Sequence, residues 1–135
     1  MTKKIPAQLP LTNIDPLQIR RVYENIIANA LEHNRSGLHL TLQVERDYLK
    51  SDRQIIANSK RWIDCTISDD GKGIPPHLHS QLFNLYTRKA SNKQSLSAGL
   101  GLYICRQIID AHGGEIGINS SNKGASFWFT LPIVK

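Results

Sequence analysis

The chain has 135 residues, a length typical of a single domain that buries its own hydrophobic core. Hydrophobic residues make up 40% of it and charged residues 21%, a balance that excludes the disordered class. The formal net charge is +6, but lysines and arginines are scattered and form no dense run, so the charge alone does not indicate a nucleic-acid partner.

The sequence also bears on the compartment. Its apolar stretches are far shorter than the roughly 18 residues of a membrane-spanning helix, and no apolar signal-peptide core follows Met1. Cys65 and Cys105 lie in apolar runs, at a spacing that fits neither metal ligands nor a disulfide framework. We therefore expect a cytoplasmic domain with buried, reduced thiols and no membrane insertion.

The first elements are a lead-in and a helix. Residues 1–14 carry two prolines and predict at most a short edge strand. Asp15 followed by Pro16 is typical of a helix N-terminus. Apolar residues then recur at helical spacing and predict a helix to about Asn34; they are Ile19, Val22, Ile26 and Ala30.

Strands and a second helix follow. Alternation over 38–44 predicts a half-buried strand, and a second strand is predicted around 63–67 after a polar connection over 46–59. A short helix is expected near 76–84, and the polar residues 87–98 are expected to be mobile. The next helix is predicted to start at Gly99–Leu102, with apolar residues at 100, 104 and 108, and to end at the glycine cap after His112.

Two closing strands complete the pattern. Their apolar positions are Ile116 and Ile118, then Phe127, Phe129, Leu131 and Ile133, with a turn at residues 122–124. The order of elements predicts an α+β fold in two layers, an antiparallel or mixed sheet covered by helices on one face.

Three polar residues form a row on the first helix. Asn25, Asn29 and His33 are four residues apart and therefore lie on one side of it. Amide oxygens are hard ligands that suit Mg²⁺, and asparagine is a poor helix former, so two in mid-helix suggest a site. Taken singly, each asparagine is also explained as a polar residue beside the core stripe.

A carboxylate and two glycines end the strand around 63–67. Asp69 has the parity of the buried face, where a carboxylate needs a donor such as the exocyclic amine of adenine. Gly71 and Gly73 allow close backbone approach and positive φ. An Asp-Gly turn that merely ends a strand is the alternative. Asp70 has the opposite parity and is expected to face solvent.

A second glycine motif stands at the expected start of the second helix. The free N–H groups and positive dipole end of a helix beginning at Gly99–Leu102 would suit phosphate oxygens. The chain has no Walker A loop. The polar stretch before Gly99 resembles a lid that folds over phosphates.

In this order, the motifs resemble those of the catalytic, ATP-binding domain of sensor histidine kinases, within the gyrase, Hsp90, histidine kinase and MutL ATPase superfamily (HATPase_c). The resemblance implies a Bergerat fold, with a mixed, mostly antiparallel sheet covered on one face by about three helices. Residues 1–11 would be a lead-in and 12–135 the domain, with a lid at about 75–98. The matching segments are Glu24–Ala30 (N box), Asp69–Pro75 (G1 box), Leu82–Arg88 (F box) and Gly99–Ile104 (G2 box).

The resemblance assigns roles to individual residues. It implies that Asn29 coordinates Mg²⁺ with Asn25 beside it, that these asparagines and Arg88 act in catalysis, and that Asp69 binds the adenine amine. The other nucleotide contacts it implies are His33 near the ribose or base, Gly71, Gly73 and Ile74 around the base, Arg88 and Lys89 near the phosphates, and Gly99, Leu100, Gly101 and Leu102 along the triphosphate.

The family implies that the domain binds Mg-ATP and donates the γ-phosphate to a histidine on a separate dimerisation domain of a two-component kinase. Phosphoryl transfer needs positioning and charge neutralisation more than covalent chemistry by the protein. None of the five histidines has the His-Glu/Asp context of an acceptor; they are His33, His39, His77, His79 and His112. The expected partners are therefore a dimerisation domain and a response regulator, with no nucleic acid, and the domain alone is expected to be a monomer.

Three positions depart from the family pattern and leave alternatives open. Glu32 stands where a lysine often reaches the phosphates, Ser97 replaces a glycine, and Ala125 replaces a threonine. A weakly binding or non-catalytic nucleotide module is thus one alternative. A serine kinase of the anti-sigma-factor type shares the fold but usually has Glu at the position of Asn25. A basic nucleic-acid binder is supported by no motif.

Overall fold

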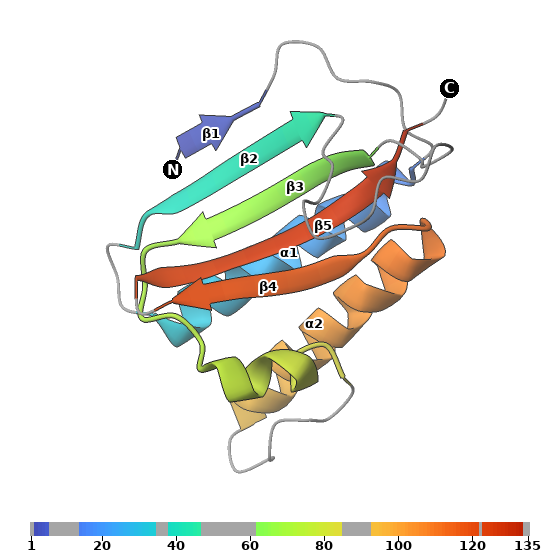
Figure 1. Cartoon of the computed structure of the whole chain (residues 1–135). Helices are drawn as coiled ribbons and strands as arrows, with labels where there is room; N and C mark the ends of the chain where they lie inside the picture. The colour runs from blue at the N-terminus through green and yellow to red at the C-terminus, as the bar shows by residue number, and fades with distance from the viewer. Residues whose placement is uncertain are drawn as a thin grey trace.

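The computed structural model describes residues 2–5, 14–34, 38–46, 62–84, 93–121 and 123–133, and it has the two layers that the sequence predicts (Figure 1). α1 and α2 cover one face of a five-stranded sheet, and the short 3₁₀ helix η1 lies beside α2. In chain order the elements are β1 (Thr2–Lys4), α1 (Pro16–His33), β2 (Leu40–Arg46), β3 (Trp62–Asp69), η1 (Pro76–Gln81), α2 (Lys93–Ala111), β4 (Ile116–Ser121) and β5 (Gly124–Pro132).

The sheet is mixed and mostly antiparallel, as predicted. Its strand order is β1-β2-β3-β5-β4. β1 pairs parallel with β2, whereas the other three pairings are antiparallel. β1 is the short edge strand expected in the lead-in. The expected connection between β2 and β3 lies almost entirely outside the described residues.

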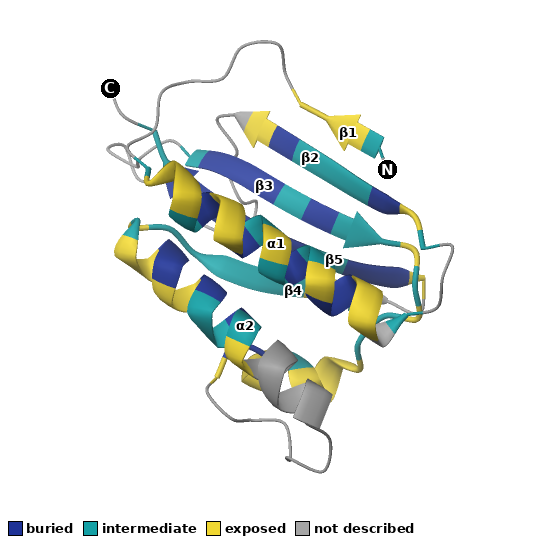
Figure 2. Cartoon of the chain, turned by 180° about the vertical axis from the view of Figure 1, so that it is seen from behind, coloured by how far each residue is buried: buried dark blue, intermediate teal, exposed yellow. Residues whose placement is uncertain are grey.

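The first helix begins and packs as its sequence indicates. The Asp15 carboxylate caps α1 by accepting the N–H groups of Leu17 and Gln18 at 3.1 and 3.4 Å. The apolar stripe of α1 faces the sheet, and Val22 and Ile26 are completely buried (Figure 2).

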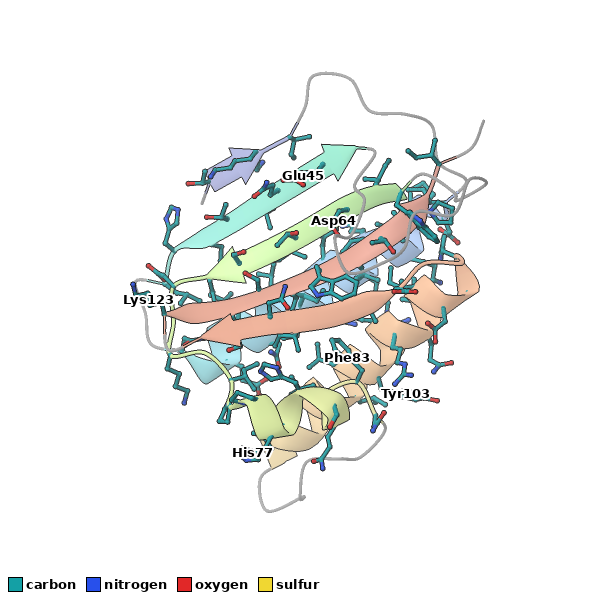
Figure 3. All side chains as sticks on the ribbon, viewed as in Figure 1. Glu45, Asp64, His77, Phe83, Tyr103 and Lys123 are labelled. Carbon is teal, nitrogen blue, oxygen red and sulfur yellow. The ribbon has the colours of Figure 1, made fainter. Side chains whose placement is uncertain are left out.

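The core lies between the two helices and the covered sheet face. Phe127 and Phe129 of β5 are its largest fully buried side chains. The Phe129 ring meets Tyr23 of α1 edge to face, with centroids 5.3 Å apart. Phe83, which is labelled in Figure 3, lies just after η1. Its ring meets that of Phe127 edge to face, with centroids 6.1 Å apart. The core therefore joins α1, β5 and the segment after η1.

The two expectations about later helices need correction. α2 begins at Lys93, not at Gly99–Leu102. The four-residue apolar spacing through Leu100 and Ile104 continues one turn earlier to Leu96, and no proline interrupts it. The short helix expected near 76–84 is the 3₁₀ helix η1, which stops at Gln81.

The end of α2 agrees with its glycine signal. Gly113 has φ +78°, and its N–H donates to the Asp110 carbonyl at 3.0 Å. The Gly114 N–H donates to the Ile109 carbonyl, also at 3.0 Å. These two bonds form a Schellman motif, which requires the left-handed conformation that glycine adopts freely.

Candidate functional site

Four of the predicted site residues meet at one cavity. Asn29 from α1 and Asp69, Gly73 and Ile74 from the end of β3 and the loop after it line a space of about 20 Å³. Such a space holds about one water molecule, whereas ligand pockets typically measure roughly 300–1,000 Å³. This space is therefore too small for a nucleotide base in the arrangement that the structure describes.

Asp69 is held in place at the mouth of this cavity. Its Oδ1 accepts the N–H groups of Gly71 at 2.9 Å and Ala125 at 3.3 Å. Its other oxygen, Oδ2, has no hydrogen-bond partner among the described residues. Asp69 thus combines a fixed carboxylate with a free acceptor, the arrangement that an exocyclic amine needs.

Asn29 has an unsatisfied polar atom in the same cavity. The side chain is 3% exposed, and Oδ1 is buried with no hydrogen-bond partner in the described part of the chain. Leaving such an acceptor unpaired costs about 1–3 kcal/mol. A hard cation would satisfy it, since amide oxygen is a ligand that Mg²⁺ accepts. The residues present therefore fit a Mg²⁺ ion.

Asn25 points elsewhere. Its Nδ2 donates to the carbonyl oxygen of Gly101 at 3.3 Å and so ties α1 to α2. Asn25 is not among the residues that line the cavity. The predicted site is thus divided into a group around Asp69 and Asn29 and a pair formed by Asn25 and Gly101.

The structure does not place Gly99–Leu102 at the start of a helix, and the amide cradle expected there stays a prediction. Because α2 begins at Lys93, these residues lie within the helix and not at its N-terminus. Leu102 is fully buried and belongs to the core, while Leu100 is exposed. The cradle required free N–H groups, which residues inside a helix do not have.

Several predicted residues lie outside what the structure describes. Arg88 and Lys89 are among them, as are the side chains of His33 and Ser97. Of the two other departures from the family pattern, Glu32 is exposed on α1, whereas Ala125 is buried and lines the cavity.

The sequence analysis missed three residues that hold the loop after β3. Asn34 accepts the Lys72 N–H at 3.1 Å, and Ser120 accepts the Ile74 N–H at 2.7 Å through its hydroxyl oxygen. The His79 ring lies 2.8 Å from the Ile74 carbonyl. No local pattern marks Asn34 or Ser120, because their contacts join elements distant in sequence, whereas His79 lies only five residues after Ile74.

Burial keeps both cysteine thiols protonated at neutral pH. Burial raises the pKa of Cys65 to about 11 and that of Cys105 to about 12. Both thiols are free, as predicted. A thiol must ionise to act as a nucleophile, so neither cysteine is prepared for covalent catalysis.

Over the described residues, no group of three or more His, Cys, Asp or Glu is arranged to hold a metal ion. None of the described helices is both long enough and apolar enough to span a membrane.

The fold and cavity match a known class of domain. A family model described as "Histidine kinase-, DNA gyrase B-, and HSP90-like ATPase" (HATPase_c) matches residues 14–135, so the chain belongs to this family of ATPase domains.

Its relatives include named sensor kinases. The chain is 34% identical over 132 residues to the adaptive-response sensory kinase SasA of Synechococcus sp. (strain JA-2-3B'a(2-13)), covering 97% of this chain and 32% of that protein. It is 36% identical over 127 residues to the alginate biosynthesis sensor protein KinB of Pseudomonas aeruginosa, covering 93% of this chain and 19% of KinB. The chain thus spans about a third of the length of SasA and about a fifth of the length of KinB.

Solved structures agree on the fold. The catalytic domain of the histidine kinase ThkA superposes with a TM-score of 0.75 at 23% identity, covering 99% of this chain and 80% of that one. Full-length ShkA, solved in complex with AMPPNP, superposes with a TM-score of 0.74 at 22% identity, covering 99% of this chain and 25% of that one. The predicted ATPase-domain fold is thereby confirmed.

Proposed function

We propose that this domain binds Mg-ATP and donates the γ-phosphate to a histidine on the dimerisation domain of a two-component sensor kinase. The observation that carries the proposal is the cavity in which Asp69 offers a free carboxylate oxygen and Asn29 an unpaired, buried amide oxygen. One would accept the adenine amine and the other would bind the cation. A nucleotide joins these two chemistries in one ligand.

The chain's own residues would divide the work. Asp69 would select adenine over guanine, because a keto oxygen facing its carboxylate would be repelled. Asn29 would hold Mg²⁺, with Asn25 joining it after leaving the Gly101 carbonyl. Bound Mg²⁺ would neutralise phosphate charge, which is the main requirement of phosphoryl transfer. His33 would lie near the base or ribose.

The proposed phosphate contacts come from Arg88 and Lys89, which lie outside the described residues, and from the Gly99–Leu102 segment of α2. Arg88 and Lys89 would add positive charge near the triphosphate. Gly99 and Gly101 would contact phosphates only after the first turns of α2 unwind, since their amides lie within the helix. Loop and helix rearrangements of this kind accompany nucleotide binding in many enzymes.

The partners follow from the chemistry of the transfer. The acceptor histidine would come from a dimerisation domain, and a response regulator would then receive the phosphoryl group. The relatives named as sensor kinases support this proposal, as does the likeness to ShkA, whose structure contains AMPPNP.

Calorimetric titration of ATP, ADP and GTP, with Mg²⁺ and then with EDTA, tests the binding step. We expect adenine-selective binding that depends on Mg²⁺. Asp69→Asn should weaken ATP binding at least about tenfold, a loss of about 1.4 kcal/mol. Asp70→Asn is the matched control, because Asp70 is exposed and accepts the His39 N–H outside the cavity. Equal ATP affinity in wild type and Asp69→Asn would remove the adenine role.

Transfer needs a second assay with a supplied dimerisation domain and ATP labelled at the γ-phosphate. Label on the histidine of that domain supports the kinase. The small cavity and the exposed Glu32 favour one alternative, a weakly binding, non-catalytic module. Mg-ATP binding without any labelling would favour that alternative.

A further inference from the structure

The side chain of Asn34 connects α1 to the loop after β3. Its Nδ2 donates to the Ala30 carbonyl in the last turn of α1 at 2.7 Å. Its Oδ1 accepts the backbone N–H of Lys72 at 3.1 Å. The donor and the acceptor of one amide are thus used on two different elements.

Gly71 lies against the Asn34 side-chain amide, where a larger residue would collide with it. A Cβ atom added at Gly71 would lie 2.0 Å from Oδ1 and 2.5 Å from Cγ of Asn34. Gly73, by contrast, has φ +76°. The two glycines therefore serve different needs: Gly73 adopts a left-handed conformation, and Gly71 leaves room for Asn34.

The connection reaches the cavity itself. Asn34 and Lys72 line the cavity together with Asn29 and Asp69. Asn29 lies on the same helix as Asn34, and Asp69 directly precedes the loop that Asn34 holds. At its far end the loop is held by the Ser120 hydroxyl, which accepts the Ile74 N–H.

We propose that Asn34 is a positioning residue that sets the distance between the cation-binding amide of Asn29 and the base-binding carboxylate of Asp69. This inference rests on the proposed function. A nucleotide would contact both groups at once, so a link that fixes their separation lowers the ordering cost of binding. Asn34 does this through its hydrogen bond to the Lys72 amide.

The coupling between metal and base is the first readout. Asn34→Ala should weaken ATP binding about tenfold with Mg²⁺ but less than about threefold with EDTA, because only the metal-bound complex needs both groups aligned. Asn34→Asp keeps the acceptor for Lys72 but loses the donor to the Ala30 carbonyl, so it too should lose most of the Mg²⁺ enhancement. Asn119→Ala, an exposed asparagine on β4, is the matched control. Equal losses with Mg²⁺ and EDTA would overturn the proposal.

A double-mutant cycle tests the contact with Gly71. Gly71→Ala alone should weaken Mg-ATP binding, because its Cβ displaces the Asn34 amide. In an Asn34→Ala background the same change should have little further effect, since the obstructing amide is gone. Additive losses would contradict the coupling.

Hydrogen exchange of the Lys72 amide, without nucleotide, separates this inference from the proposed function. Asn34→Ala should accelerate that exchange at least about tenfold, while Asn34→Asp keeps it slow. If the variants differ in this way but the wild type binds no ATP, the proposed function fails and the loop link stands. If Lys72 exchange is unchanged in Asn34→Ala, the positioning role fails whatever the ATP affinity.

Discussion

The imidazole of His112 joins the two main helices by accepting the Asp15 backbone N–H on Nε2 at 3.0 Å. Its Nδ1 lies 2.8 Å from the Ile108 carbonyl oxygen. Because a carbonyl only accepts, Nδ1 is the donor to Ile108 and Nε2 the acceptor from Asp15. The ring therefore links the N-cap of α1 to the last turn of α2.

Loss of this ring should destabilise the domain. His112→Ala removes both bonds and leaves the Asp15 N–H and the Ile108 carbonyl without them, so the free energy of unfolding should fall by about 1–2 kcal/mol. Urea denaturation monitored by fluorescence measures the change. His77→Ala serves as control, because His77 is exposed on η1 (Figure 3). Equal effects of the two changes would contradict the bridge.

Asn29→Ala should separate stability from function. The change removes a buried oxygen without a described partner, so the free energy of unfolding without ligand should stay within about 1 kcal/mol of wild type. Calorimetry should show, in contrast, that Mg²⁺ no longer strengthens ATP binding. A large loss of stability would mean that Asn29 serves the fold rather than a cation.

Gly101→Ala tests where α2 begins. Glycine inside a helix costs roughly 0.5–1 kcal/mol relative to alanine. A Cβ at Gly101 would lie 3.6 Å from Cγ of Asn25, which is ordinary contact. Thermal and urea denaturation of the ligand-free domain should therefore show a gain of about 0.5–1 kcal/mol.

The ATP affinity of the same variant reports on the bound state. If phosphates require α2 to unwind at Gly101, Gly101→Ala should weaken ATP binding even as it stabilises the free domain. Gly113→Ala is the contrasting variant, because φ +78° at that position strains any L residue and should lower stability. A loss of stability in Gly101→Ala would place Gly101 outside a helix.

Stability should fall in alkaline solution, in part through Cys105. Its pKa is about 12 in the folded domain, raised from 9.0 mainly by burial. Between these values the unfolded chain ionises the thiol while the folded chain keeps it neutral. The contribution of Cys105 is thus complete below pH 9.0 and is lost as the pH rises toward about 12.

Urea denaturation at pH 8 and pH 10 measures this loss. The decrease in free energy of unfolding between these two pH values should be smaller in Cys105→Ala than in wild type, by about 1.4 kcal/mol. The comparison of the two proteins removes the contributions that other groups make to the pH dependence, because both proteins contain them. These groups are the lysines and the buried Tyr23 and Cys65, whose pKa values burial also raises. Parallel curves for the two proteins would show that Cys105 ionises alike in both states.

Features with a short-range cause were predictable from sequence. The Asp15 cap, the Gly113 stop and the alternating strands depend on neighbours within a few residues, so their patterns indicated the elements correctly. The predicted start of α2 was wrong because the Gly99–Leu102 motif was taken as the helix N-terminus, whereas the helix already begins at Lys93.

The sequence by itself determined the helices' apolar faces, the two-layer fold and the presence of Asn29 and Asp69 as site candidates. Only the tertiary structure decided that these two share a cavity, that Asn25 bonds to Gly101 instead, and that Asn34 holds the loop beside them. The physical reason is distance along the chain. Lys72 lies 38 residues from Asn34, and Gly101 lies 76 residues from Asn25, so no local periodicity encodes either contact. Such contacts form only when the packing of α1 against the sheet and α2 brings them together.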